Sequence, residues 1–214
     1  IICKDVVVKF ENTNALNGLT LSIPAKAKVA VVGPSGAGKT TFLRLCQGFL
    51  RPNTGSMEID GQNFRYLSLD NYRSQNTLID GKPVFFGATI EENLRKVQPG
   101  ISEREFHEVL EISGLQKVLD QLPEGISTEV NQFGMPLSQG DRVTFALARG
   151  LMAGPRILLI DEALAHLDKS TQISFFENFS KISELKTVIM ATHDLRSTAQ
   201  FEQIIVLEKG VVVG

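Results

Sequence analysis

The sequence has few of the features that mark secreted, membrane-spanning or nucleic-acid-binding chains. It contains only two cysteines in 214 residues, Cys3 and Cys46, and they form no metal-type spacing. A reduced, cytosolic compartment is therefore expected. No apolar run approaches the roughly 20 residues that span a bilayer, and no signal peptide is visible. Lys and Arg are scattered at a formal net charge of −2, which argues against a nucleic-acid partner and a polybasic lipid-binding segment.

Hydrophobic residues make up 43% of the sequence, which is enough for one large domain or for a core with an inserted subdomain. Apolar and β-branched runs at 3–8, 19–23 and 29–32 predict three strands around a loop at 11–18. Further buried strands are expected at 56–59, 78–79, 156–160, 187–192 and 203–207, and helices at 39–47 and within 89–122. Strands that alternate with helices predict an α/β fold with a mostly parallel sheet.

The most informative stretch is GPSGAGKTT, residues 33–41, which follows an apolar strand and opens into a helix. Glycine-rich loops in this context bring backbone N–H groups and a helix N-terminus to bear on phosphate oxygens. Lys39 would supply a positive charge near the β- and γ-phosphates, and the Thr40 hydroxyl would ligand Mg²⁺. The candidate binding residues are Gly33, Pro34, Ser35, Gly36, Ala37, Gly38, Lys39, Thr40 and Thr41.

Two further strands end in residues that suit nucleotide chemistry. Asp161 and Glu162 follow the apolar run 156–160, at the carboxyl end where parallel sheets bind ligands. We expect Asp161 to hold the Mg²⁺ that Thr40 also contacts, and Glu162 to orient or deprotonate an attacking water. His193 ends the strand 187–192 and is a candidate for contact with the γ-phosphate.

Helix-capping patterns account for several other polar residues. Thr89 with Glu92 and Ser102 with Glu105 have capping-box spacing, so the acids of 89–122 are interpreted as a solvated helix face. Ser138 is a natural N-cap for a helix that begins near Gln139, with Asp141 as a favourable acid in its first turn. By position alone, Phe10 is an ordinary half-buried strand aromatic.

Taken in order, these motifs resemble the ATP-binding cassette of ABC transporters over essentially the whole chain. GPSGAGKT looks like the first phosphate motif of that family and ILLIDE the second. LSQGD at 137–141 resembles the signature LSGGQ, AHLD at 165–168 the loop that ends in Leu-Asp, and His193 the switch histidine. Phe10 falls where the family places the aromatic that stacks on adenine. PVFFGATIEENL and LPEGISTEV resemble segments of exporter-type cassettes.

The resemblance implies a P-loop NTPase of the RecA-like type, with a mostly parallel core, an antiparallel β subdomain and an inserted helical subdomain. Residues 1–214 would form one ABC domain, with its core at 1–82 and 151–214 and the insertion at about 83–150. The chain opens in strand-like sequence and stops at Gly214 just after a strand, so it is expected to be excised from a longer protein with membrane-spanning segments.

The implied activity is hydrolysis of ATP with Mg²⁺, in a head-to-tail dimer with a second cassette. Ser138 and Gly140 would then contact an ATP held by the partner, since they lie at a helix N-terminus. Glu162, His193 and Lys39 would carry the chemistry. The domain itself would be soluble and act at the cytoplasmic face of the cell membrane, where it would drive transmembrane domains that export a substrate. Peptides, proteins or toxins are candidate substrates, beside lipids or drugs.

Three positions depart from the family pattern. Gly81 stands where the family has a Gln that contacts Mg²⁺ and water, and the signature has Gln139 and Asp141 in place of Gly and Gln. An extra carboxylate near a triphosphate is unfavourable. The segment 131–134, NQFG, lacks the usual Glu. We therefore hypothesise a heterodimer in which the partner has the better signature.

Other functions remain as alternatives. A regulatory module would bind ATP and dimerise but hydrolyse little because of Gly81 and Asp141. A soluble ABC protein without membrane partners is disfavoured by the exporter-like stretch at 83–94. A P-loop kinase would leave LSQGD unexplained and would need an acceptor-binding lid, which the sequence does not resemble.

Overall fold

The structure, a computed structural model, describes residues 1–11, 13–184 and 186–214, which form two compact units. The first comprises Ile1–Leu78, Arg156–Glu162 and Leu185–Gly214, and the second comprises Ile79–Pro155 and Ala163–Glu184. The division expected from the sequence, a core with 83–150 inserted, stays a prediction. No helix among the described residues is both long and apolar enough to cross a bilayer.

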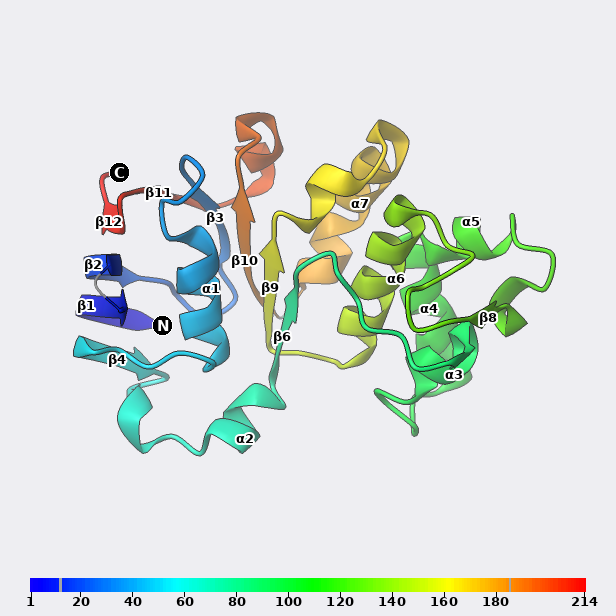
Figure 1. The fold of residues 1–214 in the computed structure, drawn as a ribbon, viewed down its shortest axis with the longest axis horizontal. Helices are drawn as coiled ribbons and strands as arrows, with labels where there is room; N and C mark the ends of the chain where they lie inside the picture. The colour runs from blue at the N-terminus through cyan, green and yellow to red at the C-terminus, as the bar shows by residue number, and fades with distance from the viewer. Residues whose placement is uncertain (12, 185) are drawn as a thin grey trace. The chain divides into compact units, whose positions relative to one another are not determined.

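A six-stranded sheet organises the first unit, in the order β12-β11-β3-β10-β9-β6 (Figure 1). Strands β11, β3, β10 and β9 run parallel, and β12 is antiparallel to β11. The parallel strands are short apolar runs, as expected for strands covered on both faces. Their bounds, with those of the edge strands, are β3 Lys28–Val32, β6 Asn76–Ile79, β9 Ile157–Asp161, β10 Thr187–Thr192, β11 Gln203–Glu208 and β12 Val211–Val212.

Helix α1, Lys39–Gln47, follows β3 and packs beside β9 and β10 of this sheet (Figure 1). Its bounds are those that the sequence predicted. Glycines flank this helix: Gly38 before it has φ 102°, and Gly48 after it has φ 83°. Gly48 ends the helix in a left-handed conformation that residues with a Cβ disfavour. Phe42, Leu43 and Leu45 of α1 are fully buried in the core of this unit.

A second sheet of the first unit is antiparallel, in the order β2-β1-β4-β5. The loop predicted at 11–18 was wrong for its described part, because residues from Thr13 onward already belong to a strand. That strand pairs with β1 from Phe10↔Thr13 to Ile2↔Ser22, so backbone pairing overrides the turn propensity of Asn14, Asn17 and Gly18. The elements are β1 Ile2–Phe10, β2 Thr13–Ser22, β4 Thr54–Ile59, β5 Gln62–Asn63, the 3₁₀ turn η1 Phe64–Tyr66 and helix α2 Leu69–Arg73.

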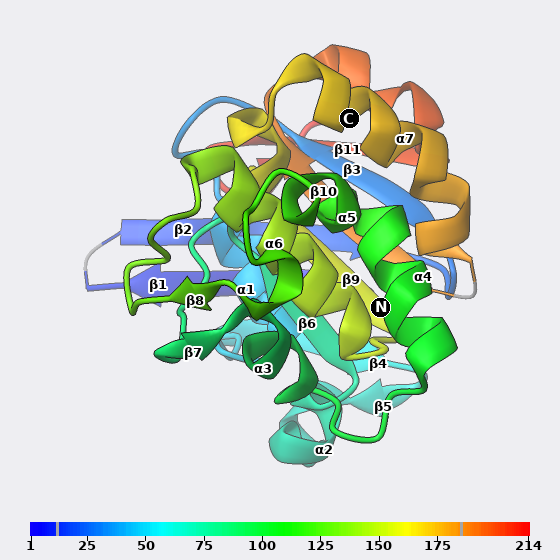
Figure 2. The same ribbon diagram turned by 90° about the vertical axis from the view of Figure 1, so that its right-hand side faces the viewer.

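The second unit is mainly helical, and α4, α5, α6 and α7 contact one another in it (Figure 2). Its core includes Phe106 and Leu110 of α4 and Phe145 of α6. Helix α7 was not predicted from the sequence. The elements are β7 Ala88–Thr89, α3 Ile90–Arg95, α4 Glu103–Ser113, α5 Leu115–Leu119, η2 Gly125–Ser127, β8 Glu129–Val130, α6 Gln139–Met152, η3 Ala163–His166 and α7 Lys169–Ser183; η4 Leu195–Gln200 belongs to the first unit.

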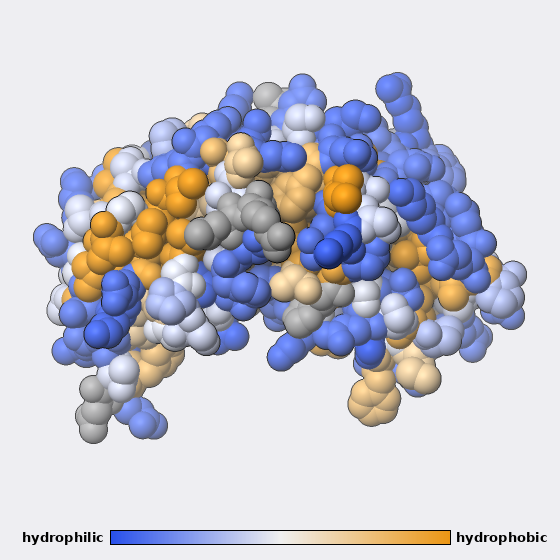
Figure 3. Space-filling model, turned by 90° about the horizontal axis from the view of Figure 1, so that it is seen from above, coloured by the Kyte–Doolittle hydropathy of each residue, from blue (hydrophilic) through white to orange (hydrophobic). Residues whose placement is uncertain are grey.

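Apolar side chains also reach the surface in both units. Figure 3 shows them on one face as several groups with polar atoms between them. Exposed aromatic residues include Phe10 and Phe49 in the first unit and Phe133 in the second. Surface apolar residues that occur singly are ordinary in soluble domains, so exposure alone does not assign them a function.

The capping boxes predicted for α3 and α4 are both formed. At α3, Thr89 Oγ1 accepts from Glu92 N–H at 3.2 Å and Glu92 Oε2 accepts from Thr89 N–H at 2.9 Å. At α4, Ser102 and Glu105 make the same reciprocal pair. The acids of these first turns therefore satisfy helix ends, as the sequence analysis proposed.

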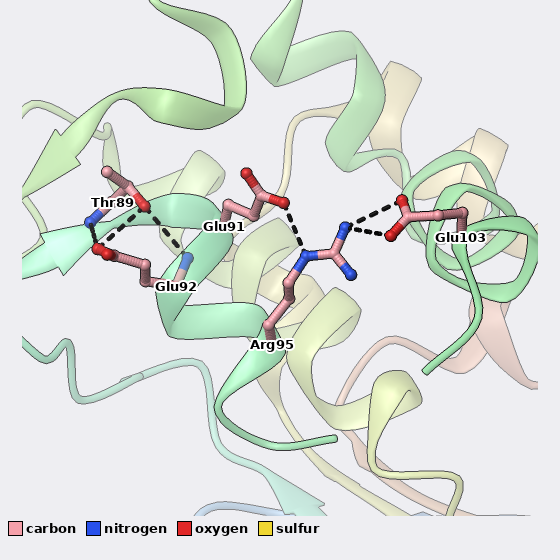
Figure 4. Close-up of polar contacts among 5 residues, drawn as sticks. All are labelled: Thr89, Glu91, Glu92, Arg95 and Glu103. Atoms are coloured by element: carbon pink, nitrogen blue, oxygen red, sulfur yellow. Dashed lines mark hydrogen bonds and ion pairs between the residues drawn. The ribbon is translucent and has the colours of Figure 1, made fainter. Parts of the chain in front are cut away.

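Arg95 joins the end of α3 to the start of α4 (Figure 4). Its Nε donates to Glu91 at 2.7 Å and its Nη2 to Glu103 at 3.0 Å. The guanidinium carbon also lies 4.1 Å from the centre of the buried Phe106 ring. Two carboxylates and one aromatic face thus hold a single cation, a geometry that suits the planar fork of arginine.

We expect Arg95→Gln to lower the free energy of unfolding by about 1–2 kcal/mol, since the network and the cation–π contact are lost together. Thermal and urea unfolding monitored by circular dichroism measure this. Arg104→Gln, an exposed arginine of α4 outside the network, is the matched control and should change stability by less than about 0.5 kcal/mol. Equal stability of the two variants would contradict the role given to Arg95.

Candidate nucleotide site

Parallel pairing brings three strand ends of the first unit to one edge of the sheet. Val32 pairs with Thr192, and Ala191 pairs with Asp161. The residues that follow these positions are therefore neighbours: the glycine loop after β3, Glu162 after β9 and His193 after β10. This is the carboxyl edge, where α/β sheets bind ligands.

The glycine loop is held in place by close backbone contacts that no side chain would allow. A Cβ at Gly33 would overlap Leu207 O of β11, and a Cβ at Gly38 would lie 2.6 Å from Ala15 O of β2. Gly210 N–H donates to Ala37 O at 3.0 Å. The loop thus packs between β2 and the turn that joins β11 to β12. Glycine is required at 33 and 38 because a Cβ would clash with backbone atoms and because both residues have a positive φ.

Lys39 lies inside this loop with only 5% of its surface exposed. Its ammonium donates to Gly33 O at 2.9 Å and Pro34 O at 3.1 Å, and it is 3.1 Å from Glu162 Oε1. Three oxygens, one of them charged, therefore satisfy the cation. A phosphate group brought to Lys39 must compete with Glu162 for it.

Asp161, the last residue of β9, has an incomplete set of partners. The Thr40 hydroxyl favours its ionised form, but Oδ1 is buried and has no hydrogen-bond partner among the described residues. Burial raises the pKa of this carboxyl above its ordinary value, with Glu162 adding to the effect, while Thr40, Arg44 and Lys39 oppose it. An oxygen of this kind has a free position for a cation.

The chemistry of this pair fits Mg²⁺. Mg²⁺ prefers oxygen ligands and is usually held by one or two protein groups together with substrate phosphates. Thr40 and Asp161 supply a hydroxyl and a carboxylate side by side. Among the described residues there is no group of three or more His, Cys, Asp or Glu that could hold a metal alone. The donor set therefore suits a metal that arrives with a nucleotide.

Glu162 is exposed for 44% of its side chain, unlike its neighbour Asp161. Its backbone has φ 51°, a left-handed conformation that costs a non-glycine residue of order 1 kcal/mol, and its N–H donates to Ala191 O at 3.1 Å. The strained turn directs consecutive acids to different surroundings: Asp161 Oδ1 is buried, and Glu162 pairs with Lys39.

The other predicted residues of the first unit are near the surface. Thr40 and His193 are exposed, and His193 directly follows β10. Phe10, 47% exposed, ends β1 opposite Thr13, in the hairpin whose Ala15 contacts the glycine loop. Pro34, Ser35 and Gly36 form the exposed tip of the loop, while Ala37 is buried and Thr41 is half-buried.

Ser138 and Gly140 belong to the second unit, at the start of α6. Ser138 Oγ accepts from Asp141 N–H at 3.2 Å, and Asp141 Oδ2 accepts from Ser138 N–H at 3.0 Å. This reciprocal capping box confirms the N-cap expected from the sequence. It also places a carboxylate at the helix end that would otherwise attract an anion.

The segment before α6 is tied firmly to that helix. Asn131 Oδ1 accepts N–H groups from Phe133 and Met135, at 2.9 and 3.1 Å. Arg142 of α6 donates to Phe133 O at 2.8 Å and to Ser138 O at 3.3 Å. This loop therefore presents two exposed apolar side chains, Phe133 and Met135, on a braced backbone.

Gly81 sits in a turn that suits glycine better than glutamine. Its φ is 71°, and Asp80 Oδ1 accepts from Lys82 N–H at 3.1 Å across it. A glutamine here would adopt a left-handed conformation that L residues with a Cβ disfavour. The departure from the family pattern is thus a change of backbone geometry as well as of side chain.

Sequence reasoning missed the residues that support the site. Ala15, Leu207 and Gly210 brace the glycine loop through backbone atoms, and no residue-type pattern announces such contacts. Asp168, which ends the predicted Leu-Asp loop, caps α7: hydrogen bonds from Ser170 and Thr171 hold the pKa of its carboxyl well below the ordinary value. The sequence signal for α7 was this Asp-x-Ser-Thr-type N-cap. The side chain of His166 in the same loop lies outside the described residues.

The chain is similar to known proteins in sequence and in fold. The family model described as "ABC transporter" matches residues 16–165. A solved bacterial Atm1-family ABC exporter with ATP bound superposes on the whole chain with a TM-score of 0.93 and 32% identity, and the match covers 37% of that exporter.

Curated relatives are similar over nearly all of this chain. The mitochondrial iron-sulfur clusters transporter ATM1 of Candida albicans is 36% identical over 96% of the chain and 29% of its own length. The heterocyst differentiation ATP-binding protein HepA of Nostoc sp. is 33% identical over 92% of the chain and 33% of its own length. The chain thus spans about a third of the length of these relatives.

Asp161→Asn should stabilise the nucleotide-free protein and abolish its response to Mg²⁺. The folded-state pKa of Asp161 is raised, so the fold favours the protonated carboxyl, and the ionised form present at pH 7 is destabilising until a cation binds. After allowance for solvent, we expect a gain of about 0.5–1 kcal/mol, or about 2 °C in Tm, by scanning calorimetry at pH 7. The additional stabilisation by Mg²⁺ with ADP should disappear.

Asp168→Ala is the contrasting control for this experiment. It removes the N-cap of α7 and should lower stability by about 1 kcal/mol while the response to Mg²⁺ with ADP persists. If Asp161→Asn melted lower than the unaltered protein and still responded to Mg²⁺, the assignment of the buried oxygen would be wrong.

Proposed function

Because this chain belongs to the ABC transporter family, we propose that it is the motor domain of an exporter, in which ATP binding and hydrolysis drive a substrate across a membrane. ATP-binding domains of this family bind ATP and are ATPases, and the fold is the P-loop NTPase fold that the sequence predicted. The observation that carries the proposal is the meeting of Lys39, Asp161 and Glu162 at one sheet edge.

Each residue has a distinct task in the proposed reaction. Backbone N–H groups of the loop from Gly33 to Thr41 bind the α- and β-phosphates, and Lys39 binds the β- and γ-phosphates. Phosphate oxygens then replace Glu162 in the shell of the ammonium. The freed Glu162 carboxylate accepts the proton of the water that attacks the γ-phosphate. His193 contacts the γ-phosphate, and Phe10 stacks on the adenine.

Mg²⁺ bound with the nucleotide would neutralise charge that develops on the phosphates. Thr40 and Asp161 are the residues of this chain that would hold it. The buried, partner-free Asp161 Oδ1 supports this assignment. Because the cation also favours the ionised carboxylate, it would lower the raised pKa of Asp161 and strengthen the site for the nucleotide complex.

The proposed assembly is a head-to-tail dimer of two such domains. In it, Ser138 and Gly140 at the start of α6 complete the nucleotide site of the partner, because helix N-termini bind phosphate groups. Transmembrane domains are the further partners, and the domain works at the cytoplasmic face of the membrane. Similarity to two mitochondrial iron-sulfur clusters transporters supports this assembly. The division into a core at 1–82 and 151–214 and an insertion at 83–150 belongs to the same proposal.

Glu162→Gln tests the proposed reaction. Steady-state release of phosphate from ATP should fall at least 100-fold, since a general base contributes about 10²–10⁴ to the rate. Binding of ATP, followed with a fluorescent analogue, should persist and tighten up to about fivefold, because Lys39 loses a competing ion pair. Lys39→Ala is the matched control and should lose binding as well as turnover. Unchanged turnover in Glu162→Gln would remove Glu162 from this role.

Asp141 favours an asymmetric assembly over a homodimer. Its carboxylate already binds the Ser138 N–H at the N-terminus of α6, where a γ-phosphate would approach. The negative charge repels that phosphate and occupies a donor that the phosphate needs. The nucleotide site that receives this helix is therefore the slower one. The faster site pairs the loop of this chain with another chain's signature helix. A purely regulatory role is the second candidate, and it would apply if both sites were slow.

We expect Asp141→Gln to raise the ATP turnover of the chain alone by about tenfold, which corresponds to about 1.4 kcal/mol of relieved repulsion. Glutamine is itself a capping-box residue, so the exchange removes the charge and lengthens the side chain by one methylene group. Glu105→Gln removes the charge from the capping box of α4 and should leave turnover unchanged. Equal turnover of Asp141→Gln and the unaltered chain would count against the heterodimer and the charge argument together.

A further inference from the structure

A second pocket of the first unit lies on the antiparallel sheet. It is bounded by the turn after α1, by β4 and β5 and by η1, and its volume is about 350 Å³. No residue of the glycine loop and neither Asp161 nor Glu162 lines it. Its charged lining residues, within the described chain, are Arg51 and Arg65. The pocket therefore has a positive lining and is separate from the nucleotide site.

Arg51 and Arg65, like most lysines and arginines of the described chain, have no acidic partner. Both are exposed, and neither makes an ion pair within the described part of the chain. Two acids of the same stretch of chain pair with other cations: Glu58 of β4 with Lys4, and Asp70 with Arg73. Two arginines thus line the same pocket, and none of the described residues that line it is acidic.

The backbone on each side of the pocket is fixed, so the two arginines start from defined positions. On the Arg51 side, Asn53 N–H donates to Val7 O and Asn53 Oδ1 accepts from Lys9 N–H, both at 2.8 Å. On the other side, Asn63 Oδ1 accepts from Arg65 N–H at 2.9 Å. These bonds tie the turn and η1 to the sheet.

The floor and the rim of the pocket are also informative. Met57 and Phe64 form a buried floor, each 1% exposed, and Phe64 packs edge-on against Tyr72 at 5.8 Å. Tyr66, at the rim, is 83% exposed. Because Asn63 Oδ1 is already used as an acceptor, its amide NH₂ is the group left to donate, beside the hydroxyl of Ser56. The lining therefore supplies cationic and neutral donors over an apolar base.

We infer that this pocket binds a phosphate-bearing anion with a small attached group, held between Arg51 and Arg65. Guanidinium groups match phosphate oxygens in bidentate geometry, and charge-assisted bonds are the strong ones. Asn63 and Ser56 add donors, and the Tyr66 ring covers the attached group. A volume of about 350 Å³ lies at the small end of ligand pockets, which fits a phosphomonoester or phosphodiester head. Such a head comes from a soluble metabolite or from an anionic lipid.

Two probes distinguish these sources, both used with the 214-residue chain carrying Lys39→Ala so that the nucleotide loop does not compete. Inorganic pyrophosphate represents soluble anions and is titrated by calorimetry. Vesicles of phosphatidylcholine with about 30% phosphatidic acid represent lipid heads, and pure phosphatidylcholine vesicles are their reference, in a flotation assay. Binding of pyrophosphate alone identifies a soluble ligand, and binding of the charged vesicles alone identifies a lipid head.

Arg51→Gln and Arg65→Gln should each weaken the bound probe about tenfold, and the double variant should abolish binding. Arg51→Lys should recover part of the loss, because lysine keeps the charge and not the fork. Arg104→Gln, an exposed arginine of α4, is the control and should bind as before. Circular dichroism confirms that each variant is folded.

The inference is overturned if neither probe binds, if the double variant binds as well as its parent, or if Arg104→Gln weakens binding equally. Its failure is separable from that of the proposed function. The pocket variants, made with Lys39 intact, should hydrolyse ATP at the unaltered rate, and loss of ATP binding by the unaltered chain would fault the nucleotide proposal while leaving the pocket result standing.

Discussion

Parallel pairing of β9, β10 and β3 is the constraint on which the nucleotide site depends. Neighbouring strands lie about 4.8 Å apart, so the ends of β9 and β3, with β10 between them, are separated by about 10 Å. The Lys39 side chain spans this separation, and its Nζ lies 3.1 Å from Glu162 Oε1. A one-residue slip in either pairing would turn Asp161 to the opposite face and separate it from Thr40.

Much of this arrangement could be read from the sequence because it depends on local chemistry. The glycines on either side of α1 set its bounds at Lys39 and Gln47, and the Ser138 cap follows from residue type and spacing. Long-range contacts could not be read in this way. Strand β2 contains residues that locally favour turns, and only its pairing with β1 makes a strand of them. Helix α7 was overlooked although Phe175 and Phe179 stand at helical spacing on its buried side.

The site residues show the same division between local and long-range information. Motif spacing identified Lys39, Asp161 and Glu162, and the register explains why they meet. It gave no sign that Glu162 forms an ion pair with Lys39 or that Asp161 Oδ1 has no partner among the described residues, since both depend on side-chain positions. Two of the departures that the sequence revealed, Gly81 and Asp141, are consistent with their backbone surroundings. Gly81 satisfies a left-handed turn, and Asp141 satisfies the capping box of α6.

The double hydrogen bond of Arg142 has a mechanical consequence. One guanidinium group grips Phe133 O in the exposed loop and Ser138 O at the cap of α6, and Asn131 stiffens the loop itself. The loop tip and the helix cap are therefore linked through one side chain. A displacement of Phe133 would strain the same guanidinium group that holds Ser138 O, so the exposed loop and the cap of α6 are mechanically coupled.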